Sequence, residues 1–333
     1  MKIESLLRIT GGVLLNTPSV NTISDIKISP AKILSKDLFI DINNSEDEIS
    51  EAIKNGAYCI VTASIPNITD EEIAWICVES LHMALIKLSR FFATDKNFNF
   101  VLLSSLQYQL SKYLHLETKV QTLSQTPSDA LLQIINAPSE TIFFVIDNAF
   151  ITKIDPTLTP SKNSLEPDSI FEKSIFYSSF IFSQKFFTEI RLPSIFIPHL
   201  CSLLHYLDTS EIEYTLENFN NFEHFYPQFI DNSLHAKDFG TTRKALIFES
   251  DCELFQEEIN FLERKIDFND LIVFIPTDKV DSFTCKAQKI VYKHALEIDK
   301  LKNRGFRYAL IYGKISDFQE SMKEKCSQQM TLF

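Results

Sequence analysis

Cysteine and histidine are the residues of this chain whose chemistry could be recognised from spacing alone. The chain has six cysteines and seven histidines among 333 residues. The cysteines never form a Cys-x-x-Cys pair, and no His-Glu-x-x-His motif occurs, so the spacing of a zinc site is missing. We therefore expect no metal site. We expect reduced, mostly buried thiols at Cys59, Cys77, Cys201, Cys252, Cys285 and Cys326.

The charge of the chain is acidic, with a formal net charge of −12 and a pI near 5.1. The 32 lysines and arginines are scattered, so the basic patch that would neutralise nucleic-acid phosphates is missing. The first residues, MKIESLLR, lack the apolar core of a signal peptide, and no stretch reaches the roughly 18 apolar residues of a membrane span. We expect a cytoplasmic protein that binds neither nucleic acid directly nor a membrane.

Strands and helices alternate along most of the chain. Residues 37–42 predict a strand, residues 48–55 a helix that Gly56 ends in a left-handed conformation, and residues 57–62 the next strand. Further strands are predicted at residues 98–103, 141–147, 244–248, 270–275 and 306–312. Further helices are predicted at residues 80–92, 106–114, 199–207, 253–265, 294–303 and 316–325. The Phe-rich residues 175–190 favour short β elements.

This alternation predicts an α/β fold built from parallel, Rossmann-like sheet units. A chain of this length exceeds what one hydrophobic core usually serves, so several domains are expected. A polar break at residues 95–97 and the glycine at Gly240 suggest the boundaries. We predict three domains at residues 1–95, 96–239 and 240–326, followed by a tail at residues 327–333.

Several short motifs, in the same order, resemble those of the bacterial Mur ligases, which build peptidoglycan precursors. Residues 23–30 (ISDIKISP), 37–42 (DLFIDI) and 52–57 (AIKNGA) resemble the family's serine-x-aspartate-x-arginine, GDLFVAL and A…GA. Residues 192–200 (LPSIFIPHL), 229–236 (FIDNSLHA) and 243–254 (RKALIFESDCEL) resemble LPGxHNVxN, IDDSYNA and RKIAVLGDMLEL. The similarity is greatest to members that add D-alanyl-D-alanine to a UDP-linked muramoyl peptide. The resemblance implies a three-domain architecture with a central ATP-binding domain.

In the family, a glycine-rich loop, G-x-x-G-K-T-T, follows the first strand of the central domain and holds the ATP phosphates. This chain reads LSSLQYQLSK at residues 103–112, and no glycine occurs between Gly56 and Gly240. Bulky Cβ atoms prevent a backbone from curling around phosphate. The degenerate loop therefore contains Ser104, Gln107, Tyr108 and Gln109, with Tyr108 in place of the phosphate-binding lysine. We expect no cofactor.

Other catalytic features of the family are also only partly present in this chain. Asp147 stands where the family has its acidic residue, but no histidine follows in residues 148–192 to hold a second metal ion. We predict no catalytic residue, and hence a pseudoenzyme that binds or scaffolds and is linked to peptidoglycan precursor synthesis. Asp231, Asn232 and His235 remain as a vestigial linker that caps and packs the chain before the last domain. The alternative is an active ATP-dependent ligase of UDP-muramoyl peptides with a divergent site.

The carboxyl-terminal residues 329–333 (QMTLF) resemble the peptide with which many bacterial replication and repair proteins bind the sliding clamp. Such a peptide places a glutamine amide and two apolar anchors in a cleft of its partner. Gln329, Met330, Leu332 and Phe333 are accordingly predicted to bind a protein partner, either the sliding clamp or a cell-wall synthesis enzyme. A third hypothesis is thus a clamp-associated factor in DNA replication or repair. The alternative is that Leu332 and Phe333 fold back on their own domain.

Overall fold

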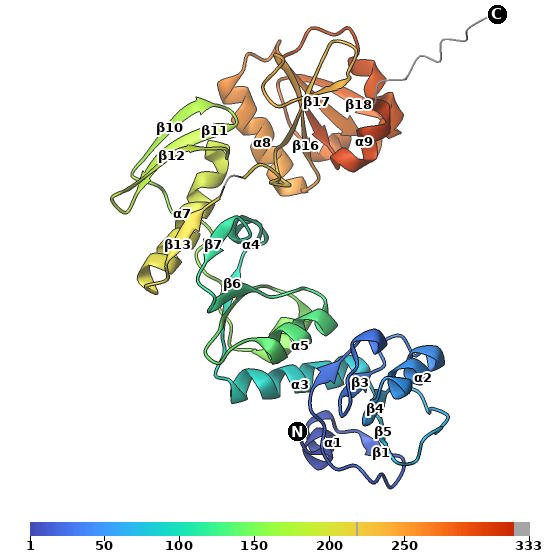
Figure 1. The fold of residues 1–333 in the computed structure, drawn as a ribbon. Coiled ribbons are helices and arrows are strands. Elements are labelled where there is room, and N and C mark those ends of the chain that lie inside the picture. The colour runs from blue at the N-terminus through green and yellow to red at the C-terminus, as the bar shows by residue number, and fades with distance from the viewer. Residues whose placement is uncertain (218, 323–333) are drawn as a thin grey trace, which may run out of the picture. The chain divides into compact units, whose positions relative to one another are not determined.

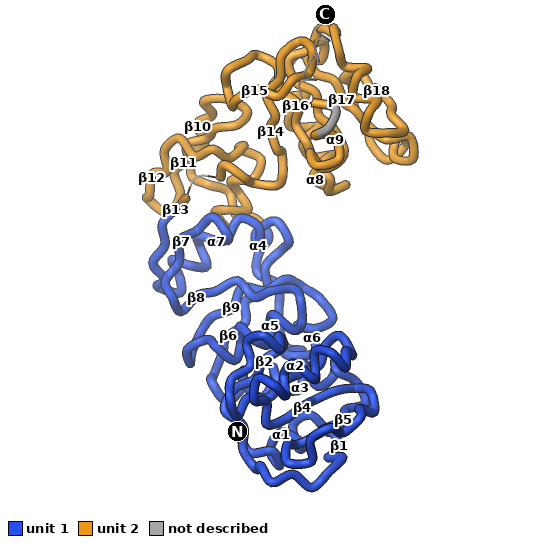
Figure 2. The backbone as a smooth tube through the Cα atoms, turned by 45° about the vertical axis from the view of Figure 1, so that its right-hand side comes forward, with its two compact units in different colours: residues 1–163, 203–216 blue, residues 164–202, 217–333 orange. Residues whose placement is uncertain are grey.

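The computed structural model describes residues 1–217 and 219–322, which form two compact units (Figures 1 and 2). Unit 1 comprises Met1–Asn163 and Leu203–Leu216. Unit 2 comprises Ser164–Ser202 and the described residues from Glu217 onward. Helix α7 (Ile197–Thr209) contributes residues to both units.

The first part of unit 1 is a five-stranded sheet in the order β1-β5-β4-β3-β2. Its four strands from β2 to β5 are parallel, and only β1 is antiparallel. Ser45 caps α2, and Gly56 follows that helix with a φ of 100°. The elements are α1 (Ile3–Thr10), β1 (Val13–Leu14), β2 (Ile26–Lys27), η1 (Pro30–Lys32), β3 (Leu38–Ile40), α2 (Glu46–Lys54), β4 (Cys59–Thr62), β5 (Ala74–Cys77) and α3 (Leu81–Asp95).

The second part of unit 1 is a parallel three-stranded sheet in the order β6-β9-β8. A two-stranded antiparallel ribbon pairs β7 with β13 (Tyr214–Leu216). One continuous apolar core joins this part to the first sheet through side chains of α3 and α5. The elements are β6 (Asn99–Leu103), α4 (Ser105–Ser111), β7 (Leu114–Leu116), β8 (Val120–Thr122), α5 (Pro127–Asn136), β9 (Ile142–Ile146) and α6 (Ala149–Ile154).

Unit 2 contains a six-stranded sheet in the order β15-β14-β16-β19-β17-β18. The four strands from β16 to β18 in this order are parallel, whereas β14 and β15 are antiparallel. Strands β16, β19 and β17 are almost wholly buried, and the edge strand β18 is partly exposed. The elements are β14 (Tyr226–Ile230), β15 (Ala236–Lys237), β16 (Lys244–Glu249), α8 (Cys252–Lys265), β17 (Leu271–Pro276), η3 (Thr277–Ser282), β18 (Gln288–Tyr292), η4 (Ala295–Leu301), β19 (Tyr308–Tyr312) and α9 (Ile315–Met322).

Unit 2 also contains an antiparallel three-stranded sheet of β10 (Ser169–Ser174), β11 (Tyr177–Phe182) and β12 (Lys185–Ile190). Along β11 every second residue is buried, which places Phe180 and Phe182 on one face. The opposite face exposes Phe171 and Phe186, whose rings meet edge to face at 6.4 Å. The Phe-rich stretch thus forms the short β elements that its composition favours.

The predicted α/β class with parallel-sheet units is confirmed. Residues 295–301 are a 3₁₀ helix, which is tighter and shorter than the helix predicted at residues 294–303. The strand β18 was not expected. The six-stranded sheet includes β14 and β15, which precede residue 240. The division into three domains stays a prediction. No helix in the described ranges has the length and apolar character needed to cross a membrane.

Candidate functional site

The amino terminus of α4 is the place where the sequence predicts a degenerate phosphate loop. It follows β6 directly, and β6 pairs in parallel with β9. Ser104 caps the helix: its hydroxyl accepts a hydrogen bond from the Gln107 amide at 3.2 Å, and the Gln107 side-chain oxygen accepts one from the Ser104 amide at 3.0 Å. This reciprocal capping box consumes two of the donors that a helix terminus would offer to a phosphate.

Gln107 also anchors a segment that follows α6. Its side chain is fully buried, and its Nε2 donates to the carbonyls of Lys162 at 2.7 Å and Asn163 at 3.3 Å. The Ser161 hydroxyl donates to the Gln107 side-chain oxygen at 3.2 Å, and the Ser161 amide donates to the Leu102 carbonyl at 3.0 Å. Residues 160–163 are therefore held beside the end of β6, so the protein's own groups saturate the polar atoms of Gln107.

Tyr108 does not project into the loop where the family has its lysine. It is 5% exposed, and its hydroxyl donates a 2.5 Å hydrogen bond to the Leu123 carbonyl. Burial raises the pKa of this phenol. Lys112 lies over the Tyr108 ring at 5.2 Å and donates to the Gln109 side-chain oxygen at 2.8 Å. These contacts give Tyr108 a packing role in α4 and leave Lys112 on the helix surface.

Asp147 follows β9, the strand beside β6, and so emerges at the same sheet edge as Ser104. Its carboxylate accepts a 3.1 Å hydrogen bond from the Thr152 hydroxyl. The neighbouring Asn148 caps α6 by accepting from the amides of Phe150 and Ile151. Among residues 1–217 and 219–322, no group of three or more histidine, cysteine, aspartate or glutamate side chains is arranged to hold a metal ion.

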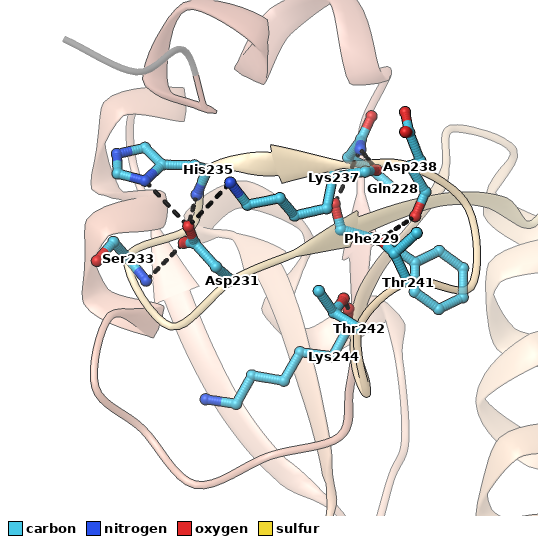
Figure 3. Close-up of polar contacts among 10 residues, drawn as sticks. All are labelled: Gln228, Phe229, Asp231, Ser233, His235, Lys237, Asp238, Thr241, Thr242 and Lys244. Carbon is cyan, nitrogen blue, oxygen red and sulfur yellow. Dashed lines mark hydrogen bonds and ion pairs between the residues drawn. The ribbon is translucent and has the colours of Figure 1, made fainter.

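The predicted linker residues Asp231 and His235 are brought together in the turn between β14 and β15 (Figure 3). One Asp231 oxygen accepts from the amides of Ser233 at 2.8 Å and His235 at 3.0 Å. The other contacts the His235 ring at 3.1 Å and the Lys237 ammonium at 3.4 Å. Partial burial opposes ionisation, but these hydrogen bonds outweigh it and hold the Asp231 pKa below its usual value. Asn232 is exposed at the tip of the turn.

A buried acid cluster at the carboxyl end of β16 was not predicted. Glu249 and Glu258 are 1% and 0% exposed, and the His224 ring contacts Glu249 at 2.9 Å. The sequence carried one signal of this cluster. Glu249 stands where the resembling family motif has a glycine, so a large acid replaces a residue without a side chain. The predicted partner-binding residues Gln329, Met330, Leu332 and Phe333 lie outside the described residues.

The parallel sheets, their order along the chain and the antiparallel entry into the last sheet together define the fold of the Mur ligases. Among solved structures, the chain is similar to the MurF ligase from Thermotoga maritima in complex with ADP, with a TM-score of 0.57 and 13% identity over 90% of this chain and 96% of that chain. MurF from Acinetobacter baumannii gives a TM-score of 0.57 and 9% identity over 96% of this chain and 97% of that chain.

A further structure from Acinetobacter baumannii, a UDP-N-acetylmuramoylalanyl-D-glutamyl-2,6-diaminopimelate–D-alanyl-D-alanyl ligase, has a TM-score of 0.55 and 9% identity over 96% of this chain and 97% of that chain. No family model and no curated protein sequence matches the chain. At these low sequence identities, the structural similarity shows the fold alone.

Proposed function

We propose that this chain is a Mur-ligase-like protein that binds or scaffolds and does not ligate, with a role linked to peptidoglycan precursor synthesis. The observation that carries the proposal is the state of the α4 amino terminus. Its capping box is closed by Gln107, and that side chain is also bonded to residues 162 and 163. A phosphate would need the same backbone amides and the space next to them.

The replacement of the loop lysine supports the same conclusion. Acyl-phosphate chemistry concentrates negative charge, which enzymes stabilise with a lysine and metal ions held at the loop. Tyr108 is buried at the position that corresponds to that lysine, and Lys112 bonds to Gln109 one turn further on. The rival function, a ligase of UDP-muramoyl peptides with a divergent ATP site, would require α4 to uncap and Gln107 to leave its buried partners.

Nucleotide binding separates the two functions. Isothermal titration of Mg²⁺-ADP and Mg²⁺-ATP into the full chain is expected to give no saturable heat, and the Thermotoga maritima MurF ligase serves as the binding control because its structure holds ADP. Saturable, Mg²⁺-dependent binding of either nucleotide would favour the rival function, an active ligase with a divergent ATP site. Formation of a ligation product from a UDP-muramoyl tripeptide and D-alanyl-D-alanine would establish it and refute the proposal.

The sequence of the tail supports a second candidate function. Residues 329–333 read QMTLF, which matches the polar-then-apolar order of a clamp-docking peptide. On this hypothesis the chain is recruited to the bacterial sliding clamp as a factor in DNA replication or repair. The two candidates are compatible, since a scaffold needs a partner and the tail would supply one.

A further inference from the structure

The carboxylate of Glu249 is saturated with donors. Its Oε1 accepts hydrogen bonds from the amides of Ser250 at 2.8 Å and Asp251 at 2.7 Å. Its Oε2 lies 2.9 Å from the His224 Nδ1 and accepts from the Phe225 amide at 3.4 Å. Glu249 is therefore the hydrogen-bond acceptor on which the donors of this cluster converge.

Glu258 on α8 is in the opposite situation. It is fully buried, and within the described part of the chain neither of its oxygens meets an N–H or O–H donor. Its carboxyl group faces that of Glu249, an arrangement that forms a hydrogen bond only when one of the two carries a proton. Since the donors all point at Glu249, the shared proton belongs to Glu258, which donates it to Glu249.

The backbone next to this cluster is strained. Phe225 has a φ of 49°, in the left-handed region that a bulky side chain rarely adopts. It is 1% exposed and packs against Phe176 and Phe261, each with ring centroids 5.9 Å away. The Glu249 carboxylate accepts a hydrogen bond from the amide of this strained residue. It also contacts the ring of His224, the preceding residue in the chain. The cluster therefore fixes a conformation that the chain would not hold without support.

We propose that His224, Glu249 and Glu258 form a protonation-controlled latch. The latch holds residues 219–225, which lead from β13 of unit 1 into β14 of unit 2, in place on unit 2. It opens when the shared proton and the His224 proton are lost. The latch would thus regulate how firmly these residues are held within unit 2.

The direction of the pH effect follows from the groups around the cluster. Burial, the Glu249 charge and the hydrogen bond to Glu249 raise the Glu258 pKa well above its usual value, and Asp251 and Glu257 add to the effect. Burial would lower the His224 pKa, but Glu249, Asp251 and Glu223 outweigh it and raise that pKa. Both groups are more basic folded than unfolded. Their contribution to stability is therefore complete at low pH and is lost as the pH rises through the folded pKa values.

The test is amide hydrogen exchange of the full chain followed at Phe225, Ser250 and Asp251, with each rate divided by its intrinsic rate at that pH. In the unmodified protein we expect protection to fall at least about tenfold between about pH 6 and about pH 9. Glu258→Gln keeps a donor toward Glu249 but cannot ionise, so its loss over the same range should be less than about twofold. The matched control is Glu253→Gln, an exposed residue on the same helix that does not act on Glu258 or His224, and it should follow the unmodified protein.

Protection that does not change with pH in the unmodified protein would overturn the latch, as would the same pH profile in Glu258→Gln. If Glu258→Gln does not fold, the infrared carbonyl band of a protonated carboxylic acid in the unmodified protein decides the question. The band must be present at neutral pH and disappear on the alkaline side together with the protection. Absence of this infrared band at neutral pH would refute a proton shared between Glu249 and Glu258.

Discussion

At the scale of single residues, Gln107 and Tyr108 show how a helix terminus can be closed by side chains. Gln107 uses its amide group in both senses, as an acceptor for Ser104 and as a donor to Lys162 and Asn163. Tyr108 turns inward and finds its partner 15 residues further along the chain, at the Leu123 carbonyl. Each group is thus satisfied inside unit 1, and displacing either would leave buried polar atoms without partners.

Gln107→Ala is therefore expected to destabilise the protein by about 2–3 kcal/mol, because it removes the capping box and leaves buried donors and acceptors unpaired. The measurement is the free energy of unfolding from urea titration. Gln109→Ala is the matched control two positions along the same helix. It loses only an exposed hydrogen bond from Lys112 and should change stability by no more than about 0.5 kcal/mol. Equal effects of the two substitutions would mean that the Gln107 contacts add no stability.

The sequence predicted some of these residues and missed others for physical reasons. The absence of glycine and lysine at residues 103–112 was visible in the sequence, because backbone freedom and charge are properties of residue type. The contacts of Gln107 with residues 161–163 were not, since they join segments more than 50 residues apart. Glu258 was hidden for the same reason. On a helix, a glutamate among other charged residues usually faces solvent, and only the tertiary fold buries this one.

At the scale of elements, the alternation of strands and helices was predictable because buried parallel strands are short apolar runs bounded by turn residues. The prediction is confirmed for β3, β4, β6, β9, β16, β17 and β19. It failed for β18, where Gln288 and Lys289 interrupt the apolar pattern at an edge of the sheet. The antiparallel β14 was also missed as part of the last sheet, because Pro227 weakens the strand signal.

A substitution at Gly56 would test how strongly this glycine determines the end of α2. It ends α2 with a φ of 100°, and a Cβ atom there would lie 3.2 Å from the Ser35 backbone. Gly56→Ala should therefore lower the free energy of unfolding by about 1–3 kcal/mol, through left-handed strain and a tight contact. Gly305→Ala is the control, because no atom lies within 4 Å of the Cβ it would add. Thermal and urea unfolding of both variants check the difference, and a neutral Gly56→Ala would contradict it.

At the scale of the whole molecule, the chain keeps the Mur ligase fold at identities of 9% and 13% to the solved ligases. Such a fold can persist while its chemistry changes, because the pattern of apolar strands is determined by burial and the site is determined by a few residues. Here the strands of the fold are present, whereas residues 103–112 contain no glycine and place Tyr108 where the Mur ligase motif has its lysine. Under the proposed function the protein acts by binding a partner, which makes the tail the next feature to test.

The tail prediction concerns Leu332 and Phe333, two large apolar residues at the end of the chain. Docked in a partner's cleft, each could contribute roughly 1.5–3 kcal/mol, from which the entropy of ordering the tail must be subtracted. With the amide of Gln329 adding orientation, we expect a dissociation constant for the bacterial sliding clamp in about the micromolar to sub-millimolar range. Calorimetry of the full chain should give saturable heat.

The Leu332→Ala, Phe333→Ala double variant should lose this heat, and Gln329→Ala should weaken binding less than Phe333→Ala, because the aromatic ring removes more surface from water. Lys286→Ala, an exposed change in unit 2, is the control and should bind as the unmodified chain does. Equal heats for the double variant and the unmodified chain, or none for either, would refute clamp docking. A lower free energy of unfolding for the double variant would then favour a tail that packs on its own domain, since only that arrangement makes the two side chains part of the fold.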